Sequence, residues 1–119
     1  MVEGMSEPVA ERVPISTPIS IAVGEQTYVG GLRNISATGI FLHSMEKLNP
    51  GTTARLRFTL PGENRIFNTE GIVKWSTASD NIKSYFTGSG IAFTSMSAED
   101  RALIEKFVTA WARKVGLDA

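Results

Sequence analysis

The fold is constrained most by a series of short segments in which apolar and polar residues alternate, with turn residues between them. In the first segment, residues 15–23, the side chains of Ile15, Thr17, Ile19 and Ile21 would share one face. Similar segments are expected at residues 27–32, 39–43, 55–60, 66–76 and 88–93, with turns at Gly24, Asn49-Pro50-Gly51 and Pro61-Gly62. Such alternation is typical of strands that bury one face, so the chain is predicted to be mainly β.

The period of the apolar residues changes after residue 96. Ser97 is a predicted N-cap, and Glu99 and Asp100 lie in the first turn, where the helix dipole favours negative charge. Apolar residues then recur at steps of three and four, namely Leu103, Ile104, Phe107, Val108, Trp111 and Val115. This pattern, with Gly116 as a stop, predicts a helix over residues 97–115.

Six strands joined by short turns and followed by one helix indicate a six-stranded antiparallel β-barrel over residues 13–95, with the helix packed on an open edge or end. Trp75 is expected inside the barrel and Trp111 beneath the helix. A bulge or sharp bend is expected at Gly30-Gly31. Residues 1–12 are predicted to form a flexible N-terminal arm, because they contain few groups to bury.

The composition of the chain excludes several classes of function. Its 119 residues suit one domain, and a hydrophobic content of 42% is enough for a core. The 12 basic and 12 acidic residues balance, so we expect no nucleic-acid binding, which needs a concentrated basic face. No metal site is expected in a chain without cysteine and with one histidine. Neither a membrane span nor a signal peptide is recognisable, which predicts a cytoplasmic protein without membrane insertion.

The stretch from residue 34 to residue 44 is the best candidate for a binding site. Asn34 and Ser36 are two residues apart, so in an extended chain both side chains point to the same side. Gly39 follows, where another group can approach the backbone, and the apolar run Ile40-Phe41-Leu42 suits a buried strand. The same residue types also form β-turns, and the residues taken by themselves favour a turn over a polar site.

The spacing Asn34-x-Ser36-x-x-Gly39 before an apolar strand resembles the second ligand motif of the PilZ domain family. PilZ domains are small bacterial β-barrels, and many of them bind cyclic di-GMP. The resemblance extends from about Arg12 to the C-terminal helix and includes Arg12-Val13-Pro14-Ile15, Leu48-Asn49-Pro50-Gly51-Thr52, Gly71-Ile72-Val73-Lys74-Trp75 and Gly90-Ile91-Ala92-Phe93. It implies a PilZ-like barrel that binds cyclic di-GMP as a ligand and uses no other cofactor.

The resemblance also implies which residues would bind the nucleotide. The family's ligand arm carries two arginines separated by three residues; Arg12 matches the second, but Pro8 stands in place of the first, and Glu7 and Glu11 would repel a dianion. A lost charge-assisted contact typically costs about 1.5–3 kcal/mol, or roughly one to two orders of magnitude in affinity. The implied ligand-binding set is Arg12, Asn34, Ser36 and Gly39, with no catalytic or metal-binding residue.

Other polar side chains are expected to be structural. Arg33 would point to the face opposite Asn34, and His43 is a strand-end residue. Arg55, Arg57 and Lys74 would be a solvated strand face, or a modest basic patch if the fourth and fifth strands pair.

Two functions remain open at the level of sequence. The first is a cyclic di-GMP receptor whose N-terminal arm becomes ordered on the nucleotide and so changes the surface offered to a partner protein. The second is a PilZ-like adaptor that binds no nucleotide and acts by protein–protein interaction, for example on motility or type IV pilus machinery. An enzyme is not expected, because no catalytic set, phosphate-binding glycine loop or metal-ligand spacing is present. The partner protein is not identifiable from the sequence.

Overall fold

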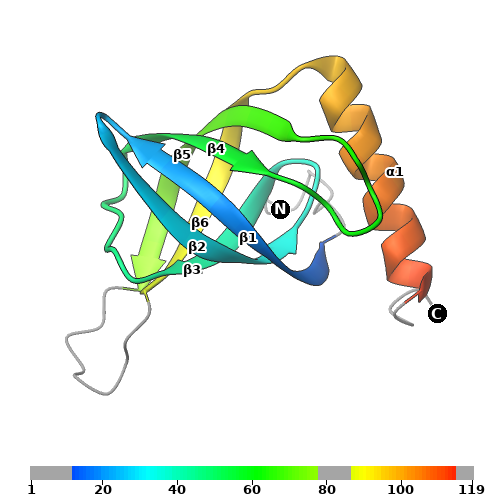
Figure 1. The fold of residues 1–119 in the computed structure, drawn as a ribbon, viewed down its shortest axis with the longest axis horizontal. Helices are drawn as coiled ribbons and strands as arrows, with labels where there is room; N and C mark the ends of the chain where they lie inside the picture. The colour runs from blue at the N-terminus through cyan, green and yellow to red at the C-terminus, as the bar shows by residue number, and fades with distance from the viewer. Residues whose placement is uncertain (1–11, 78–86, 115–119) are drawn as a thin grey trace, which may run out of the picture.

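The computed structural model describes residues 12–77 and 87–114, and these form a closed antiparallel β-barrel with one C-terminal helix (Figure 1). The predicted fold class is therefore confirmed. The strands follow one another around the barrel in the order β1-β2-β3-β6-β5-β4. Their bounds are β1 Val13–Val23, β2 Gln26–Ile35, β3 Gly39–Ser44, β4 Thr53–Phe58, β5 Phe67–Thr77 and β6 Thr87–Ser95, and the helix α1 is Ala98–Lys114.

The alternation in the sequence places the core inside the barrel. In β4, Ala54, Leu56 and Phe58 are buried, whereas Arg55 and Arg57 between them are exposed. The same inward rows on the other strands include the fully buried Ile19, Ile21, Leu32, Leu42 and Val73. Each large aliphatic side chain buried in this way contributes roughly 1.5–3 kcal/mol, so these rows supply the main stabilisation of the barrel.

Gly30-Gly31 does not form the bulge predicted there. Gly30 pairs regularly with Ile19, and a Cβ on Gly30 would approach the carbonyl oxygen of His43 to 2.5 Å, so glycine permits close packing of β2 on β3. The bulge in this pair of strands instead lies at Arg33, because Leu32 pairs with Leu42 and Asn34 with the adjacent Phe41. A second bulge lies at Lys74 in β5.

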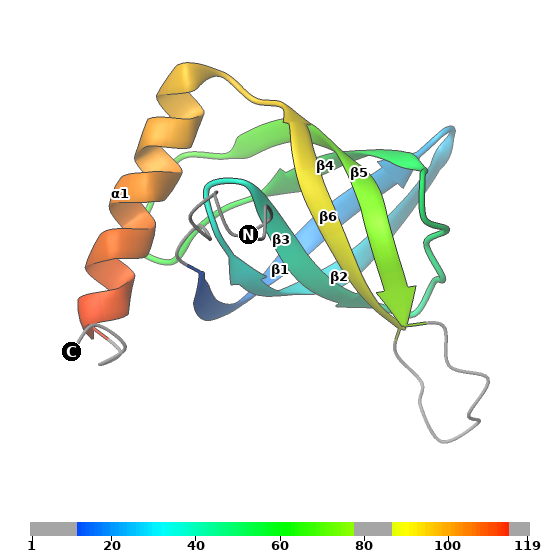
Figure 2. The same cartoon turned by 180° about the vertical axis from the view of Figure 1, so that it is seen from behind.

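The helix α1 lies across one end of the barrel, beside the start of β1 and the β2–β3 turn (Figures 1 and 2). Its first turn is capped as predicted, since the Ser97 hydroxyl accepts a hydrogen bond of 3.0 Å from the Asp100 amide. Its buried residues are Ile104, Phe107, Val108 and Ala112, and Trp111 is half-buried. No helix in the described residues has the length and apolarity needed to cross a bilayer.

Some sequence predictions concern residues that the structure does not describe. These are the arm at residues 1–12 apart from Arg12, including Glu7, Pro8 and Glu11, and the helix end at Val115 and Gly116.

Candidate functional site

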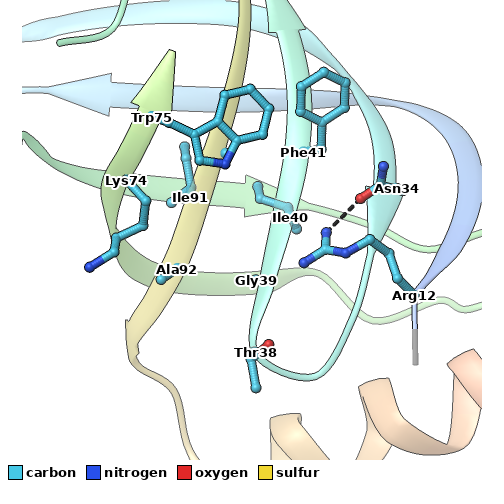
Figure 3. A pocket seen from close by; sticks show the side chains of 11 residues that line it. Arg12, Asn34, Thr38, Gly39, Ile40, Phe41, Lys74, Trp75, Ile91 and Ala92 are labelled. Carbon is cyan, nitrogen blue, oxygen red and sulfur yellow. Dashed lines mark hydrogen bonds between the residues drawn. The ribbon is translucent and has the colours of Figure 1, made fainter. Parts of the chain in front are cut away.

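A surface cavity of about 540 Å³ lies on the outer face of β3, β6 and β5 and is bordered by the residue before β1 and by β2 (Figure 3). This volume is within the usual range for small-molecule sites. The lining residues are Arg12, Asn34, Thr38, Gly39, Ile40, Phe41, Lys74, Trp75, Gly90, Ile91 and Ala92. Three of the four predicted ligand residues, Arg12, Asn34 and Gly39, are among them.

Arg12, from the predicted ligand arm, is hydrogen-bonded to two residues of the predicted second motif. Its Nη1 donates a hydrogen bond of 2.5 Å to Oδ1 of Asn34, and its Nη2 donates a long one of 3.4 Å to the Ser36 hydroxyl. Figure 3 shows the guanidinium lying over β3 at the edge of the cavity. Asn34 and Ser36 thus present their polar groups to the same side, as their spacing predicts.

No ion pair joins Arg12 to a carboxylate of the described residues. Partial burial lowers the pKa of Arg12 from its ordinary value, although an arginine remains protonated at neutral pH. Arg12 is nonetheless exposed at the edge of the cavity, where an anion would form charge-assisted hydrogen bonds with its guanidinium.

Ser36 itself is fully buried and does not line the cavity. Its hydroxyl accepts a hydrogen bond of 3.2 Å from the Thr38 amide, and its own amide donates one of 2.9 Å to the Gly39 carbonyl. These bonds close the β2–β3 turn, which is the structural alternative that the sequence left open. The predicted contact between Ser36 and a ligand stays a prediction.

Gly39 lies in the wall of the cavity where β3 approaches β6 closely. A Cβ at this position would overlap the carbonyl oxygen of Ile91. Glycine is therefore required here by strand packing, and its bare backbone also leaves the cavity open beside Arg12.

Trp75 is not inside the barrel, and this prediction was wrong. Its side chain is 47% exposed and lies on the cavity wall. The cause is the bulge at Lys74: Val73 pairs with Ile91 and Trp75 with the adjacent Gly90, so one extra residue turns Trp75 outward while Val73 stays in the core.

The indole of Trp75 forms a flat aromatic surface with the ring of Phe41. The two rings are stacked, with centroids 5.3 Å apart and an interplanar angle of 23°. Two glycines of β6 leave room for these rings. A Cβ on Gly88 would overlap the Phe41 ring, and a Cβ on Gly90 would overlap the Trp75 indole. Sequence reasoning missed this surface, although glycines two residues apart in a strand were a signal that rings pack over it.

Lys74 borders the cavity on the side opposite Arg12 and Asn34 (Figure 3). The predicted basic patch of Arg55, Arg57 and Lys74 does not form, although β4 and β5 do pair. Arg55 lies opposite Glu70 in the register of β4 and β5. Both arginines line a different cavity, and Lys74 is not among its lining residues.

Arg33 lies on another part of the surface, beside Val29 and His43, as its predicted orientation away from Asn34 requires.

The cavity therefore combines two cationic side chains with an exposed aromatic face, and its lining includes no acidic side chain from residues 12–77 and 87–114. Such a site suits a ligand that has both an anionic group and a planar ring, because guanidinium binds phosphate and an indole face stacks on a nucleobase. The described residues contain no group of three or more histidine, aspartate or glutamate side chains placed to hold a metal ion.

Several solved structures share this fold. The Bacillus subtilis inhibitor of motility (MotI/DgrA) matches with a TM-score of 0.77 at 20% identity, over 95% of this chain and 54% of that one. MrkH from K. pneumonia, in a complex with c-di-GMP, matches with a TM-score of 0.70 at 14% identity, over 95% and 56%. PlzA from Borreliella burgdorferi, also in complex with c-di-GMP, matches with a TM-score of 0.62 at 14% identity, over 91% and 52%.

At these identities the structural matches show the fold alone, and the chain spans about half the length of each matched protein. A comparison with curated proteins found no match. The sequence does match the family model described as the PilZ domain, over residues 9–110. Because this match covers most of the chain and includes the entire barrel, the chain belongs to the PilZ domain family.

Proposed function

We propose that this PilZ domain is a receptor module for cyclic di-GMP and that the nucleotide binds in the cavity beside Arg12. The observation that carries the proposal is that one cavity holds both the exposed indole of Trp75 and the Arg12 guanidinium, which is bonded to Asn34 and forms no ion pair with a carboxylate of the described residues. Cyclic di-GMP offers two phosphates and two guanines, which are the chemical groups that such a cavity suits. MrkH and PlzA, which share the fold, were solved in complexes with c-di-GMP.

Each side chain has a distinct role in the proposed complex. Arg12 would bind a phosphate or the O6/N7 edge of a guanine, and the Asn34 amide would accept or donate a hydrogen bond to the base. Trp75, supported by Phe41, would stack on a guanine, which is worth about 1–3 kcal/mol per base. Lys74 would add a second positive charge on the far side of the cavity.

Calorimetry with cyclic di-GMP at moderate salt tests the proposal. We expect Arg12→Ala to weaken binding by about tenfold or more, since a charge-assisted contact is worth about 1.5–3 kcal/mol. Arg33→Ala is the matched control, because it removes an exposed arginine that lines a different cavity. Absence of binding heat with the unmodified protein at high micromolar concentration would contradict the proposal.

A second pair of variants tests the aromatic surface. Trp75→Ala should weaken binding by about tenfold, in line with the loss of one stacked base. Ile66→Ala is its control, because Ile66 is equally exposed at 47% but lines another cavity. Equal affinities of the two variants would exclude Trp75 as a contact.

The effect of Pro8 on affinity is testable by placing an arginine at this position. Pro8→Arg combined with Glu11→Gln should raise the affinity for cyclic di-GMP by at least tenfold, because it adds a donor for phosphate and removes a repelling charge. Glu11→Gln alone separates the two effects. An unchanged affinity in the double variant would show that residues 1–11 do not limit binding.

The proposed regulatory output is an ordering of the N-terminal arm over the nucleotide, which would change the surface seen by a partner protein in the cytoplasm. The matched family and structures are binding or regulatory proteins, which supports a receptor role over a catalytic one. Limited proteolysis with and without cyclic di-GMP tests this output: the nucleotide should slow cleavage within residues 1–11. Equal cleavage rates would leave the arm without a role.

The second candidate function is an adaptor that binds no nucleotide. Pro8 in place of the first family arginine favours it, as does the fold shared with an inhibitor of motility. The calorimetric experiment separates the two functions, because an adaptor gives no heat with cyclic di-GMP and keeps its partner binding when Arg12 is replaced.

A further inference from the structure

The helix α1 holds both chain segments that carry the predicted ligand residues. Near its start, Nη1 of Arg101 donates a hydrogen bond of 2.9 Å to the carbonyl oxygen of Ala37. Ala37 lies in the β2–β3 turn, between Ser36 and the cavity residue Thr38. This bond is partly buried and joins residues 64 positions apart, so it is a tertiary contact between α1 and the turn.

Near the end of α1, Nε1 of Trp111 donates a hydrogen bond of 2.8 Å to the carbonyl oxygen of Pro14. Pro14 is two residues after Arg12 and is paired with Asn34 in the sheet. The strand is irregular directly after Pro14, so this short segment is separated from the regular part of β1. Trp111 is in turn stacked on Phe107, with ring centroids 5.3 Å apart.

These two contacts lie ten residues apart on the helix, about 15 Å at 1.5 Å per residue. One fixes the turn that ends in Gly39, and the other fixes the backbone from which Arg12 projects. The relative position of the two segments determines whether Arg12 reaches Asn34 and Ser36. A rigid helix that contacts both can therefore set the geometry of the cavity without touching a ligand.

We propose that Arg101 and Trp111 are positioning residues that couple the docking of α1 to the nucleotide site. The coupling deepens the proposed function and rests on it. Since linkage is reciprocal, a nucleotide that needs the assembled site must also stabilise the docked helix. The helix is then a second element, besides the N-terminal arm, through which binding at the cavity reaches the rest of the molecule.

The coupling is measurable without nucleotide. In Arg101→Gln, amide hydrogen exchange at Thr38 should be faster than in the unmodified protein, because the turn loses its tie to α1. Arg101→Lys, which keeps a donor, should restore part of the protection. Lys106→Gln, on the exposed face of the same helix, is the control and should leave Thr38 unchanged. Equal exchange at Thr38 in all four proteins would overturn the proposal.

A second experiment uses cyclic di-GMP. Both Arg101→Gln and Trp111→Phe, which keeps the ring but removes the N–H, should weaken nucleotide binding by about tenfold. In the unmodified protein the nucleotide should slow exchange along α1, and in the variant with both changes it should not. Slowing of the same size in both proteins would overturn the coupling.

The two experiments distinguish a failure of the proposed function from a failure of the positioning role. If the unmodified protein does not bind cyclic di-GMP, the proposed function fails, and the nucleotide-free exchange at Thr38 still decides whether α1 positions the turn. If the nucleotide binds equally well to Arg101→Gln and to the unmodified protein, the proposed function stands and the positioning role of Arg101 is contradicted.

Discussion

Two side chains of the cavity owe their direction to single extra residues in two strands, β2 and β5. Asn34 follows the bulge at Arg33, and Trp75 follows the bulge at Lys74. In a regular strand Asn34 would share the inward face of Leu32, and Trp75 that of Val73. Each bulge turns the next side chain outward, and the two bulged strands bring both side chains to one cavity.

The Ser36 hydroxyl is predicted to stabilise the protein through the turn. Ser36→Ala should lower the free energy of unfolding by about 1–2 kcal/mol, because the Thr38 amide and the Arg12 guanidinium lose an acceptor. Urea denaturation measures this change. Ser16→Ala, at an exposed position of β1, is the control and should stay within about 0.5 kcal/mol. Unchanged stability with weaker nucleotide binding would instead support the direct ligand contact that the sequence predicts.

Gly90 is predicted to determine where Trp75 lies. Gly90→Ala should push the indole away from β6, because the new Cβ would overlap the ring, and should cost about 1–3 kcal/mol of stability. Gly31→Ala is the matched control, since its Cβ would meet no atom within 4 Å. Tryptophan emission and urea denaturation report the two effects, and the same values in both variants would contradict this account.

Among the elements, α1 combines the strongest local signals with contacts that link distant parts of the chain. Its cap and acidic first turn follow from its own residues, and its buried side chains join the same core as those of the barrel. Arg65, in the segment between β4 and β5, pairs with Asp100 at 2.6 Å and adds a third attachment beside those to β1 and the β2–β3 turn. Because Arg65 is exposed, this ion pair contributes at most about 1 kcal/mol. The helix is therefore held in place mainly by apolar packing, together with the part-buried Arg101–Ala37 hydrogen bond and the exposed Trp111–Pro14 hydrogen bond.

The Ser97 N-cap is predicted to stabilise the docked helix and therefore the protein. Ser97→Ala should destabilise the protein by about 1 kcal/mol, because the Asp100 amide loses its acceptor at the helix start. The control is Thr109→Ala, at an exposed mid-helix position where alanine is the better helix former, and it should be neutral or slightly stabilising. Thermal unfolding followed by circular dichroism compares the two, and equal midpoints would show that the cap is not used.

At the scale of the molecule, closure of the barrel and docking of the helix form one structure with a single core. The closing pair, β1 with β4, joins Ile19 to Phe58 and Ile21 to Leu56, which are far apart in sequence. The core cluster contains barrel residues such as Ile35 together with Ile104 of α1. Because neither part buries its apolar face alone, we expect them to unfold together.

This cooperativity is testable with the two tryptophans of the chain. Trp111→Phe leaves Trp75 as a reporter of the barrel, and Trp75→Phe leaves Trp111 as a reporter of the helix. In each variant the fluorescence transition in urea should coincide with the transition in far-ultraviolet circular dichroism. A helix signal that is lost at lower urea than the barrel signal would show that α1 undocks independently.

The fold was predictable from the sequence because its elements depend on neighbours along the chain. Alternation with a period of two defines the strands, and the turn signals at Gly51 and Gly62 match positions with positive φ. The helix follows from its cap and its spacing. The grouping of Arg12 with Asn34 was predictable only through the family resemblance, since 22 positions separate them.

By itself the sequence determined the mainly β class and the barrel with its C-terminal helix. The resemblance to the family predicted a common site for Arg12, Asn34 and Gly39, and these three residues do line one cavity. Only the tertiary structure decided that Trp75 faces the cavity, that Ser36 is buried in the turn, and that Arg101 and Trp111 form hydrogen bonds with the β2–β3 turn and with the start of β1. The physical reason is that a bulge and a long-range hydrogen bond are relations between segments. Their geometry depends on which partner lies opposite, and local periodicity carries no information about that partner.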